Sequence, residues 1–257
     1  MHMQHRAQPG VIKKKRNMKN TLLITAFALT SLVSVAQDTK VINDSHAQKR
    51  SASGFHGVHI SSGIDLYLSQ GSEEAVAVSA DDPEVRDKIL VEVKDGILEI
   101  YIDNHNFHWG SWSNRHMKAY VSIRNIDELV ASGGSDVYMQ DPIHSSQLKM
   151  NLSGGSDLHG KLNVENLTIH QSGGSDSYVS GTATTLNINT SGGSDYHGYD
   201  LAADNCRVEA SGGSDAYLTV NKELSASASG GSDVHYKGNG VVRSSQASGS
   251  GSITHRD

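Results

Sequence analysis

One pentapeptide, Ser-Gly-Gly-Ser-Asp, restricts the fold more than any other feature of this 257-residue chain. Its copies begin at Ser132, Ser153, Ser172, Ser191, Ser211 and Ser229, so the intervals are 21, 19, 19, 20 and 18 residues. A near-constant period of this size is typical of stacked repeats, each of which packs against its neighbours. One straight strand of that length cannot return to a parallel neighbour, so each period must coil through shorter strands and corners. The period therefore predicts an all-β solenoid with 19–20 residues per rung.

The residues around each repeat show which side chains face inward. Before each copy, apolar and polar residues alternate, as in Leu148, Met150 and Leu152, which indicates a strand with one buried face. Cys206 is the only cysteine and occupies an inward leucine slot, so we expect a core residue rather than a nucleophile. The residue after each Asp should also face inward: Val137, Leu158, Ser177, Tyr196, Ala216 and Val234.

The region before the first repeat has a different pattern and is predicted to cap the solenoid, because the ends of a stack need atypical repeats. Hairpin signals lie at Gly71-Ser72 and Asp95-Gly96, and one helical turn is expected over 83–88. The stretch "SSGIDLYL" carries a degenerate motif copy, with Asp65 followed by Tyr67. We divide the chain into an N-terminal extension with signal peptide (1–36), a flexible linker (37–52), a β cap (53–126) and the repeat solenoid (127–257), the last two forming one continuous domain.

The N-terminal segment predicts export. Between Met18 and Ala36 a basic start precedes an apolar run and a small-residue cleavage site, which is the pattern of a secretory signal peptide. Either Met1 or Met18 can be the start of the protein. No later stretch approaches the roughly 20 apolar residues of a membrane-spanning helix, and no cysteine lies at the cleavage point to carry a lipid anchor. We expect a location in the periplasm, at the outer-membrane surface or in the extracellular medium.

The segment 103–117 lacks strand periodicity and is expected to be a loop. It holds both tryptophans, Trp109 and Trp112, together with three histidines. Two interpretations stay open, a flap that packs on the cap and an exposed aromatic recognition loop. Zinc binding has little support, because no cysteine or clear carboxylate partner accompanies the histidines, His105, His108 and His116. We predict no metal site there.

The composition excludes one class of partner. The formal net charge is −6 and 36% of the residues are hydrophobic, which argues against nucleic-acid binding. Aromatic residues make up only 5% of the chain, and this agrees with a solenoid that buries small aliphatic side chains rung by rung.

Three stretches together resemble a known group of bacterial envelope proteins. They are "FHGVHISSGIDLYLSQGSEEAVAVSADDPEVRDKILVEVKDGILEIYI", "KAYVSIRNIDELVASGGSDV" and the closing "SGSGSI". In this order, after a signal peptide, they are similar to the putative auto-transporter adhesin, head GIN domain family. The resemblance runs from about Phe55 to Ile253 and implies a right-handed parallel β-helix with a strand-rich N-terminal part. The commoner family rhythm is Ser-Gly-Ser-Gly-Asp-Ile, so no ligand is carried over residue by residue.

Two candidate ladders follow from the repeat. If the residue after each Asp faces inward, its neighbours on both sides face outward on successive rungs. Tyr and His then alternate without exception two residues after the Asp. We select these residues, with both tryptophans, as candidate ligand-binding residues: Asp136, Tyr138, Asp157, His159, Asp176, Tyr178, Asp195, His197, Asp215, Tyr217, Asp233 and His235.

The carboxylates of such a ladder need compensation, because two charges about 4.8 Å apart repel by roughly 1 kcal/mol even in water. Hydrogen bonds from adjacent Ser hydroxyls and Gly amides, protonated histidines, or bound cations can supply it. Calcium has a precedent in a Gly-Gly-x-Gly-x-Asp β-roll, but that motif recurs every nine residues, so half the ligands are missing here. We therefore predict no cofactor and leave calcium as the less favoured alternative.

The repetition favours binding over catalysis. Catalysis needs one unique constellation, whereas every rung offers the same Asp with Tyr or His. We predict an exported, non-enzymatic adhesin or surface-binding module that presents both ladders to a polymeric, glycan-like ligand. The alternatives are a structural envelope protein without a ligand and, less favoured, a polysaccharide-degrading β-helix that acts through Asp195 and His197. The sequence does not indicate the oligomeric state.

Overall fold

A computed structural model describes residues 43–102 and 116–256. The predicted signal segment and the predicted aromatic loop with Trp109 and Trp112 lie outside the described residues. The strands of the described part are β1 (Gln48–Arg50), β2 (Gly57–Ile60), β3 (Ile64–Gln70), β4 (Ala75–Ser79), β5 (Ile89–Lys94), β6 (Ile97–Ile102), β7 (Met117–Ile123), β8 (Glu128–Ala131), β9 (Val137–Met139), β10 (Ile143–Ser153), β11 (Leu158–Ser172), β12 (Ser177–Thr190), β13 (Tyr196–Gly212), β14 (Asp215–Gly230), β15 (Asp233–Lys237), β16 (Val241–Ala247) and β17 (Ser252–His255).

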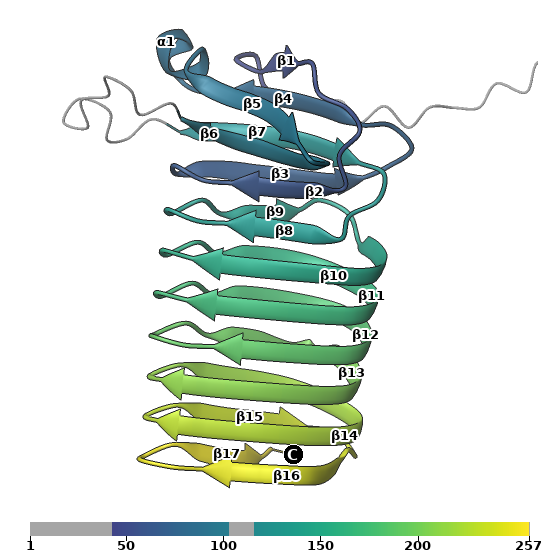
Figure 1. Ribbon diagram of the computed structural model, residues 1–257, viewed down its shortest axis with the longest axis vertical. Coiled ribbons are helices and arrows are strands. Elements are labelled where there is room, and N and C mark those ends of the chain that lie inside the picture. Colours follow the sequence, from purple (N-terminus) through teal and green to yellow (C-terminus); the bar gives the residue numbers. More distant parts are fainter. Residues whose placement is uncertain (1–42, 103–115, 257) are drawn as a thin grey trace, which may run out of the picture. The chain divides into compact units, whose positions relative to one another are not determined.

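Most of the strands are parallel and form a β-solenoid with two faces, while β1, β4 and β5 pair antiparallel in the cap (Figure 1). One sheet contains β6, β2, β8, the second halves of β10 to β14, and β16; it faces the viewer in Figure 1. The other contains β4, β7, β3, β9, the first halves of β11 to β14, β15 and β17. Front strands run to the left, rear strands to the right, and the chain descends, so the coil is right-handed as predicted.

The core is one hydrophobic cluster that extends from Phe55 to Val234. Inward residues alternate with exposed or half-buried ones along every long strand, as in the first half of β14, where Ala216, Leu218 and Val220 are buried. Cys206 is buried in the core as expected, and burial raises the pKa of its thiol to about 12. The thiol is therefore a protonated apolar group at neutral pH.

The cap confirms some local predictions and corrects others. β5 and β6 form the predicted hairpin, with Asp95 and Gly96 at φ values of 51° and 79°. The predicted helical turn is α1 (Pro83–Arg86), capped by the Asp82 side chain. The hairpin predicted at Gly71-Ser72 is wrong: β7 lies between β3 and β4, parallel to β3 and antiparallel to β4.

Part of the segment predicted as a flexible linker is a strand. β1 lies within 37–52 and pairs antiparallel with β4, so this stretch belongs to the cap. The polar, exposed sequence of β1 resembles a linker because an edge strand buries little of its surface.

The repeated motif forms a stack of tight turns at one edge of the solenoid. The first glycine of every copy has a positive φ, as in Gly192 at 79°. A Cβ on Gly192 would lie 3.1 Å from the backbone nitrogen of Gly173 in the preceding rung. The serine before each Asp is fully buried at this edge: Ser135, Ser156, Ser175, Ser194, Ser214 and Ser232. Backbone conformation and close stacking thus both require glycine at the first position.

Candidate ligand-binding face

The parallel register places the predicted Tyr and His residues in one column on the rear sheet. His159 pairs in register with Tyr138 and Tyr178, and His197 with Tyr178 and Tyr217. Tyr67 of the degenerate cap copy is in register with Tyr138, which confirms that "SSGIDLYL" forms a rung of the same stack.

The column is a continuous stack of rings. From the cap downward the order is Tyr120, Tyr67, Tyr138, His159, Tyr178, His197, Tyr217 and His235. Neighbouring centroids are 4.5–5.5 Å apart, and from Tyr138 to Tyr217 the interplanar angles are only 2–7°. Stacking at this spacing covers the ring faces, so the column presents ring edges, hydroxyls and imidazole nitrogens to the outside.

The hydroxyls of Tyr120, Tyr138, Tyr178 and Tyr217 have raised pKa values and stay protonated at neutral pH. Partial burial, followed by the carboxylates of Asp176, Asp157 and Asp195, raises the pKa of Tyr178 above its ordinary value. Tyr178 is 41% exposed, which makes it one of the most exposed large hydrophobic residues in the described part of the chain. Its hydroxyl is therefore an accessible donor and acceptor of hydrogen bonds.

A second column consists of carboxylates, and each one binds the next rung. The amide of Asp157 donates to Asp136 Oδ1 at 3.0 Å, and the amide of Asp176 donates to Asp157 Oδ1 at 3.1 Å. The same bond recurs at every later step down to Asp233. At the top, Asp65 accepts the amide of Asp136, and burial raises the pKa of the Asp65 carboxyl.

The observed donors differ from those predicted. Ser hydroxyls and Gly amides were the hydrogen-bond donors considered from the sequence, but the amide of the next Asp binds each carboxylate from Asp136 to Asp215, and a Ser hydroxyl, that of Ser252, binds the last one, Asp233. The buried serines also join consecutive rungs, as where Ser194 Oγ accepts the amide of Ser175 in the preceding rung at 3.1 Å. Among residues 43–102 and 116–256, no group of three or more His, Cys, Asp or Glu side chains is arranged to hold a metal ion.

Both columns end at the last rung. Ser252 takes the Asp position and its hydroxyl donates to Asp233 Oδ1 at 2.6 Å. Thr254 takes the ring position, in register with His235. These termini, like Tyr120 at the upper end, were not among the predicted site residues, although the alternation in "KAYVSI" places Tyr120 outward. The Tyr120 hydroxyl donates to Asp44 Oδ2 at 2.8 Å.

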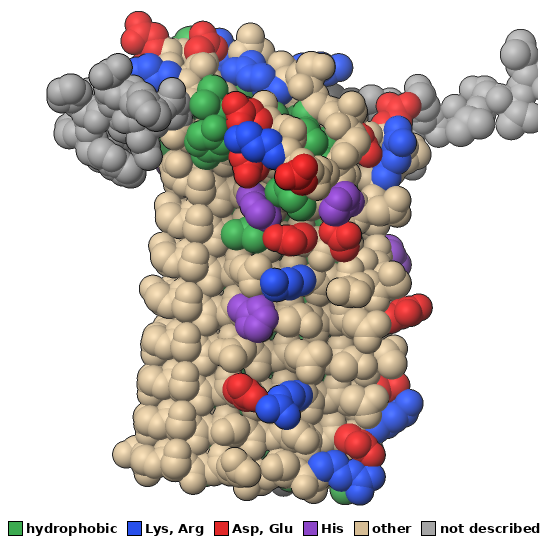
Figure 2. All heavy atoms as spheres, in the orientation of Figure 1, with side chains coloured by type: hydrophobic (Ala, Val, Ile, Leu, Met, Phe, Trp, Pro, Cys, Tyr) green, Lys and Arg blue, Asp and Glu red, His purple; other side chains and the backbone are tan. Residues whose placement is uncertain are grey.

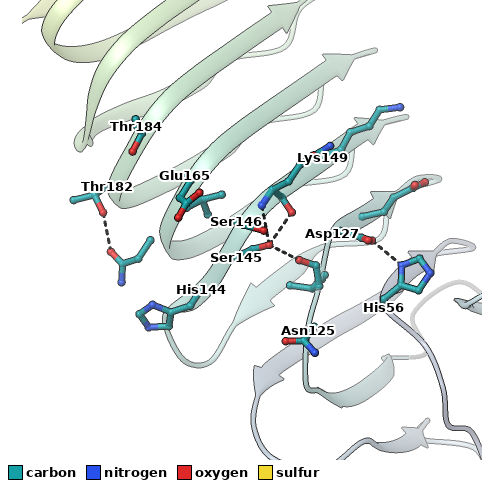
Figure 3. A pocket seen from close by; sticks show the side chains of 15 residues that line it. His56, Asn125, Asp127, His144, Ser145, Ser146, Lys149, Glu165, Thr182 and Thr184 are labelled. Atoms are coloured by element: carbon teal, nitrogen blue, oxygen red, sulfur yellow. Dashed lines mark hydrogen bonds and ion pairs between the residues drawn. The ribbon is translucent and has the colours of Figure 1, made fainter.

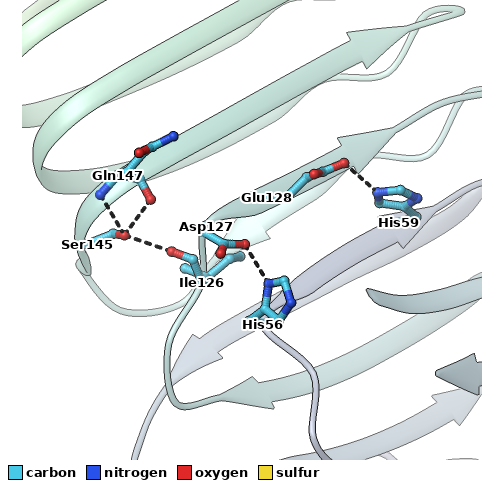
Figure 4. A network of polar contacts seen from close by, with 7 residues as sticks. All are labelled: His56, His59, Ile126, Asp127, Glu128, Ser145 and Gln147. Carbon is cyan, nitrogen blue, oxygen red and sulfur yellow. Dashed lines mark hydrogen bonds and ion pairs between the residues drawn. The ribbon is translucent and has the colours of Figure 1, made fainter. Parts of the chain in front are cut away.

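A shallow polar groove at the edge opposite the repeated turns is the second feature that the sequence did not reveal. It has a volume of about 1060 Å³ and is lined by the corners around Ser145, Asn163 and Thr182, with His56 from the cap (Figure 3). His56 Nδ1 lies 2.8 Å from Asp127 Oδ1, and His59 Nε2 lies 2.9 Å from Glu128 Oε1 nearby (Figure 4). These histidine–carboxylate pairs join the cap to the first rung.

The front sheet differs from the face that carries the columns. Its charged side chains are densest over the cap and the first rungs, and over the later rungs they are more widely spaced, several of them along the right-hand edge of the view (Figure 2). Outward positions there include His170 and Asn189, both exposed. This sheet has no stacked rings among the described residues, so it offers matched control positions for the column face.

Solved structures show the same fold. A "putative adhesin" from Bacteroides fragilis NCTC 9343 is 18% identical, with a TM-score of 0.74 and coverage of 82% of this chain and 96% of that chain. A "putative lipid binding protein" from Parabacteroides distasonis ATCC 8503 is 18% identical, with a TM-score of 0.64 and coverage of 82% and 96%. A "putative adhesin" from Parabacteroides merdae ATCC 43184 is 16% identical, with a TM-score of 0.62 and coverage of 82% and 95%.

The sequence comparisons place the chain in a family. A search of curated proteins gives no match. Within residues 43–102 and 116–256, no helix has the length and apolar composition needed to cross a membrane. The family model described as "Putative auto-transporter adhesin, head GIN domain" matches residues 54–240, and the chain belongs to this family.

Proposed function

We propose that this protein is an exported, non-enzymatic adhesin that holds a linear, hydroxylated polymer, such as a glycan, along its ring and carboxylate columns. The observation that carries the proposal is the regular repetition of the two columns, in register, on one accessible sheet. A surface that repeats at every rung suits a ligand that also repeats. Membership of an adhesin family and the signal-like segment before Ala36 support a role outside the cytoplasm.

The geometry favours binding through ring edges. Because neighbouring rings cover each other at 4.5–5.5 Å, a sugar cannot stack on a ring face within the column. A polymer laid across the edges meets Tyr hydroxyls, imidazole nitrogens and second carboxylate oxygens, since Oδ1 from Asp136 to Asp215 already accepts an amide; at Asp215 the Tyr217 hydroxyl lies 3.5 Å from Oδ2. Sugar hydroxyls can both donate to and accept from this row.

The same geometry gives no rung a special chemical role. Asp195, one candidate for a polysaccharide-degrading enzyme, donates its amide to Asp176 Oδ1 and accepts the amide of Asp215, as its equivalents in other rungs do, and the other candidate, His197, stacks between two tyrosines as His159 does. A glycosidase needs two carboxylates with different environments at one defined separation. Repetition of equal groups therefore supports a binding surface.

The second candidate function is purely structural. Each carboxylate binds the following rung and each ring stacks on its neighbours, so both columns also hold the solenoid together. Under this alternative the columns need no ligand.

A glycan array with a matched pair of variants separates the two functions. We expect the protein to bind at least one linear glycan, and the triple change Tyr138→Phe, Tyr178→Phe, Tyr217→Phe to weaken that binding roughly 100-fold. The estimate takes three hydrogen bonds of about 1 kcal/mol each. Phenylalanine keeps the stack, so unfolding should change little. The front-sheet control, His170→Gln with Asn189→Ala, should bind as the wild type does.

If the wild-type protein binds no glycan on the array, the result would support the structural alternative. Equal binding by the triple variant would show that the ring column is not the site, and a loss of binding in the front-sheet control would place the site on the other sheet.

A further inference from the structure

We infer that the ring column is matched to a polysaccharide with a two-sugar repeat, in which consecutive sugars differ. This inference rests on the proposed function, and it follows from the alternation of the rings. Tyr138, His159, Tyr178, His197, Tyr217 and His235 are adjacent in register, so the surface repeats chemically every second rung. Two rungs of parallel sheet span about 9.6 Å.

Stacking alone does not require the alternation. Tyr120, Tyr67 and Tyr138 are consecutive tyrosines at the upper end of the same column, and their centroids are 5.3 Å apart. The mixed steps from Tyr138 to Tyr217 span 4.5–5.5 Å, which is the same range. A column of tyrosines alone would also avoid adjacent imidazolium charges. The explanation for the alternation therefore lies in the outer edges of the rings, where a phenol and an imidazole differ.

The two edges differ in reach and in chemistry. A phenol extends further from the backbone than an imidazole and ends in a hydroxyl, whereas an imidazole carries one nitrogen, Nε2, at its outer end and the other, Nδ1, next to the ring atom that joins the backbone side. Because the rings from Tyr138 to Tyr217 are nearly coplanar, at 2–7°, these differences lie along one straight row. The result is a row of alternating projections and recesses. A sugar with a bulky substituent fits over an imidazole, and a smaller sugar fits over a phenol.

The charge of the adjacent column limits the class of sugar. The carboxylates from Asp136 to Asp215 accept backbone amides and that of Asp233 accepts the Ser252 hydroxyl, and in the part of the chain that the structure describes no Lys or Arg forms an ion pair with them. Lys118 lies over the Tyr67 ring at the upper end and Arg256 contacts His235 Nδ1 at the lower end, but between them an anionic polymer would meet the row of negative charge. The fitting ligand is therefore a neutral or amine-bearing polymer whose sugars alternate.

Isothermal titration with three neutral hexasaccharides tests the inference. One probe alternates galactose with N-acetylglucosamine, and the other two are uniform, cellohexaose and chitohexaose. We expect the alternating hexamer to bind the wild-type protein at least ten-fold more tightly than either uniform one. The variant His159→Tyr, His197→Tyr, His235→Tyr makes the column uniform, and we expect its preference to fall to two-fold or less. His170→Tyr on the front sheet is the control and should keep the preference.

Each other outcome contradicts a definite statement. If a uniform hexamer binds the wild type as tightly as the alternating one, the inference is wrong while the proposed function stands. If the all-tyrosine column keeps the ten-fold preference, the alternation does not select the ligand. If no hexamer binds and the glycan array is also silent, the proposed function itself fails. The single change His197→Tyr, which should lower the preference in part, replaces the triple variant if that variant does not fold.

Discussion

The two glycines of one repeat predict opposite effects of the same substitution. Gly192 has a φ of 79°, and a Cβ there would lie 3.1 Å from the nitrogen of Gly173. Alanine costs roughly 1–2 kcal/mol in the left-handed region, and the neighbouring rung must also move. Gly193 has an ordinary φ, and a Cβ added to it would meet no atom within 4 Å. Alanine at Gly193 should therefore stabilise the fold by about 0.4–1 kcal/mol, because it reduces the conformational freedom of the unfolded chain.

Urea unfolding followed by far-ultraviolet circular dichroism measures both changes. We expect Gly192→Ala to lower the free energy of unfolding and Gly193→Ala to raise it slightly, with equal m values. Gly173→Ala repeats the first geometry one rung earlier, at φ 76° and 3.3 Å from Gly154 nitrogen, and should behave like Gly192→Ala. Equal effects at Gly192 and Gly193 would refute the reasoning, because they would mean that neither the backbone conformation nor the stack distinguishes the two positions.

Two further substitutions test the burial of polar groups. The Tyr196 hydroxyl is fully buried without a hydrogen-bond partner, so Tyr196→Phe should stabilise the protein by about 1–3 kcal/mol, and a lower melting temperature would contradict this. Burial raises the pKa of Asp65, so the folded state favours the protonated carboxyl. The contribution of this group to the free energy of unfolding is complete below pH 3.8, the unfolded pKa, and is lost as pH rises through the folded pKa. Asp65→Asn keeps an acceptor for the Asp136 amide and should be more stable than the wild type at pH 7, with no advantage below about pH 3.8; pH-dependent urea unfolding measures this difference.

The repeat and its alternation were enough to predict the solenoid and both columns. Asp136 and Tyr138 could be placed outward because Val137 between them is apolar. Successive side chains of a strand point to opposite faces, so an inward Val137 requires that both of its neighbours point outward. The degenerate copy at Asp65 and Tyr67 could be recognised for the same reason, since its spacing equals that of the repeats.

The pairing of strands that lie far apart in the sequence could not be predicted from local alternation. The hairpin expected at Gly71-Ser72 assumed that β3 and β4 pair because they are consecutive, whereas β7, far along the chain, lies between them. Tyr120 joins the ring column through this insertion. The amide donor to each carboxylate also escaped prediction, because it depends on the offset between rungs, which the sequence of one rung does not contain.

The bond from each Asp to the amide of the next rung has a consequence for how such a protein can change in evolution. Removal of residues 158–176 would join Asp157 to Ser177 and place the Asp157 carboxylate next to the amide of Asp195. This amide–carboxylate contact is the same one that Asp157 and Asp176 each already make with the next Asp along the chain. Unequal recombination between repeats can thus alter the length of the binding row without creating a new kind of interface. Loss of one rung would bring two tyrosines together in the ring column, whereas loss of two rungs would restore the alternation. Selection on the row should therefore favour length changes in pairs of rungs.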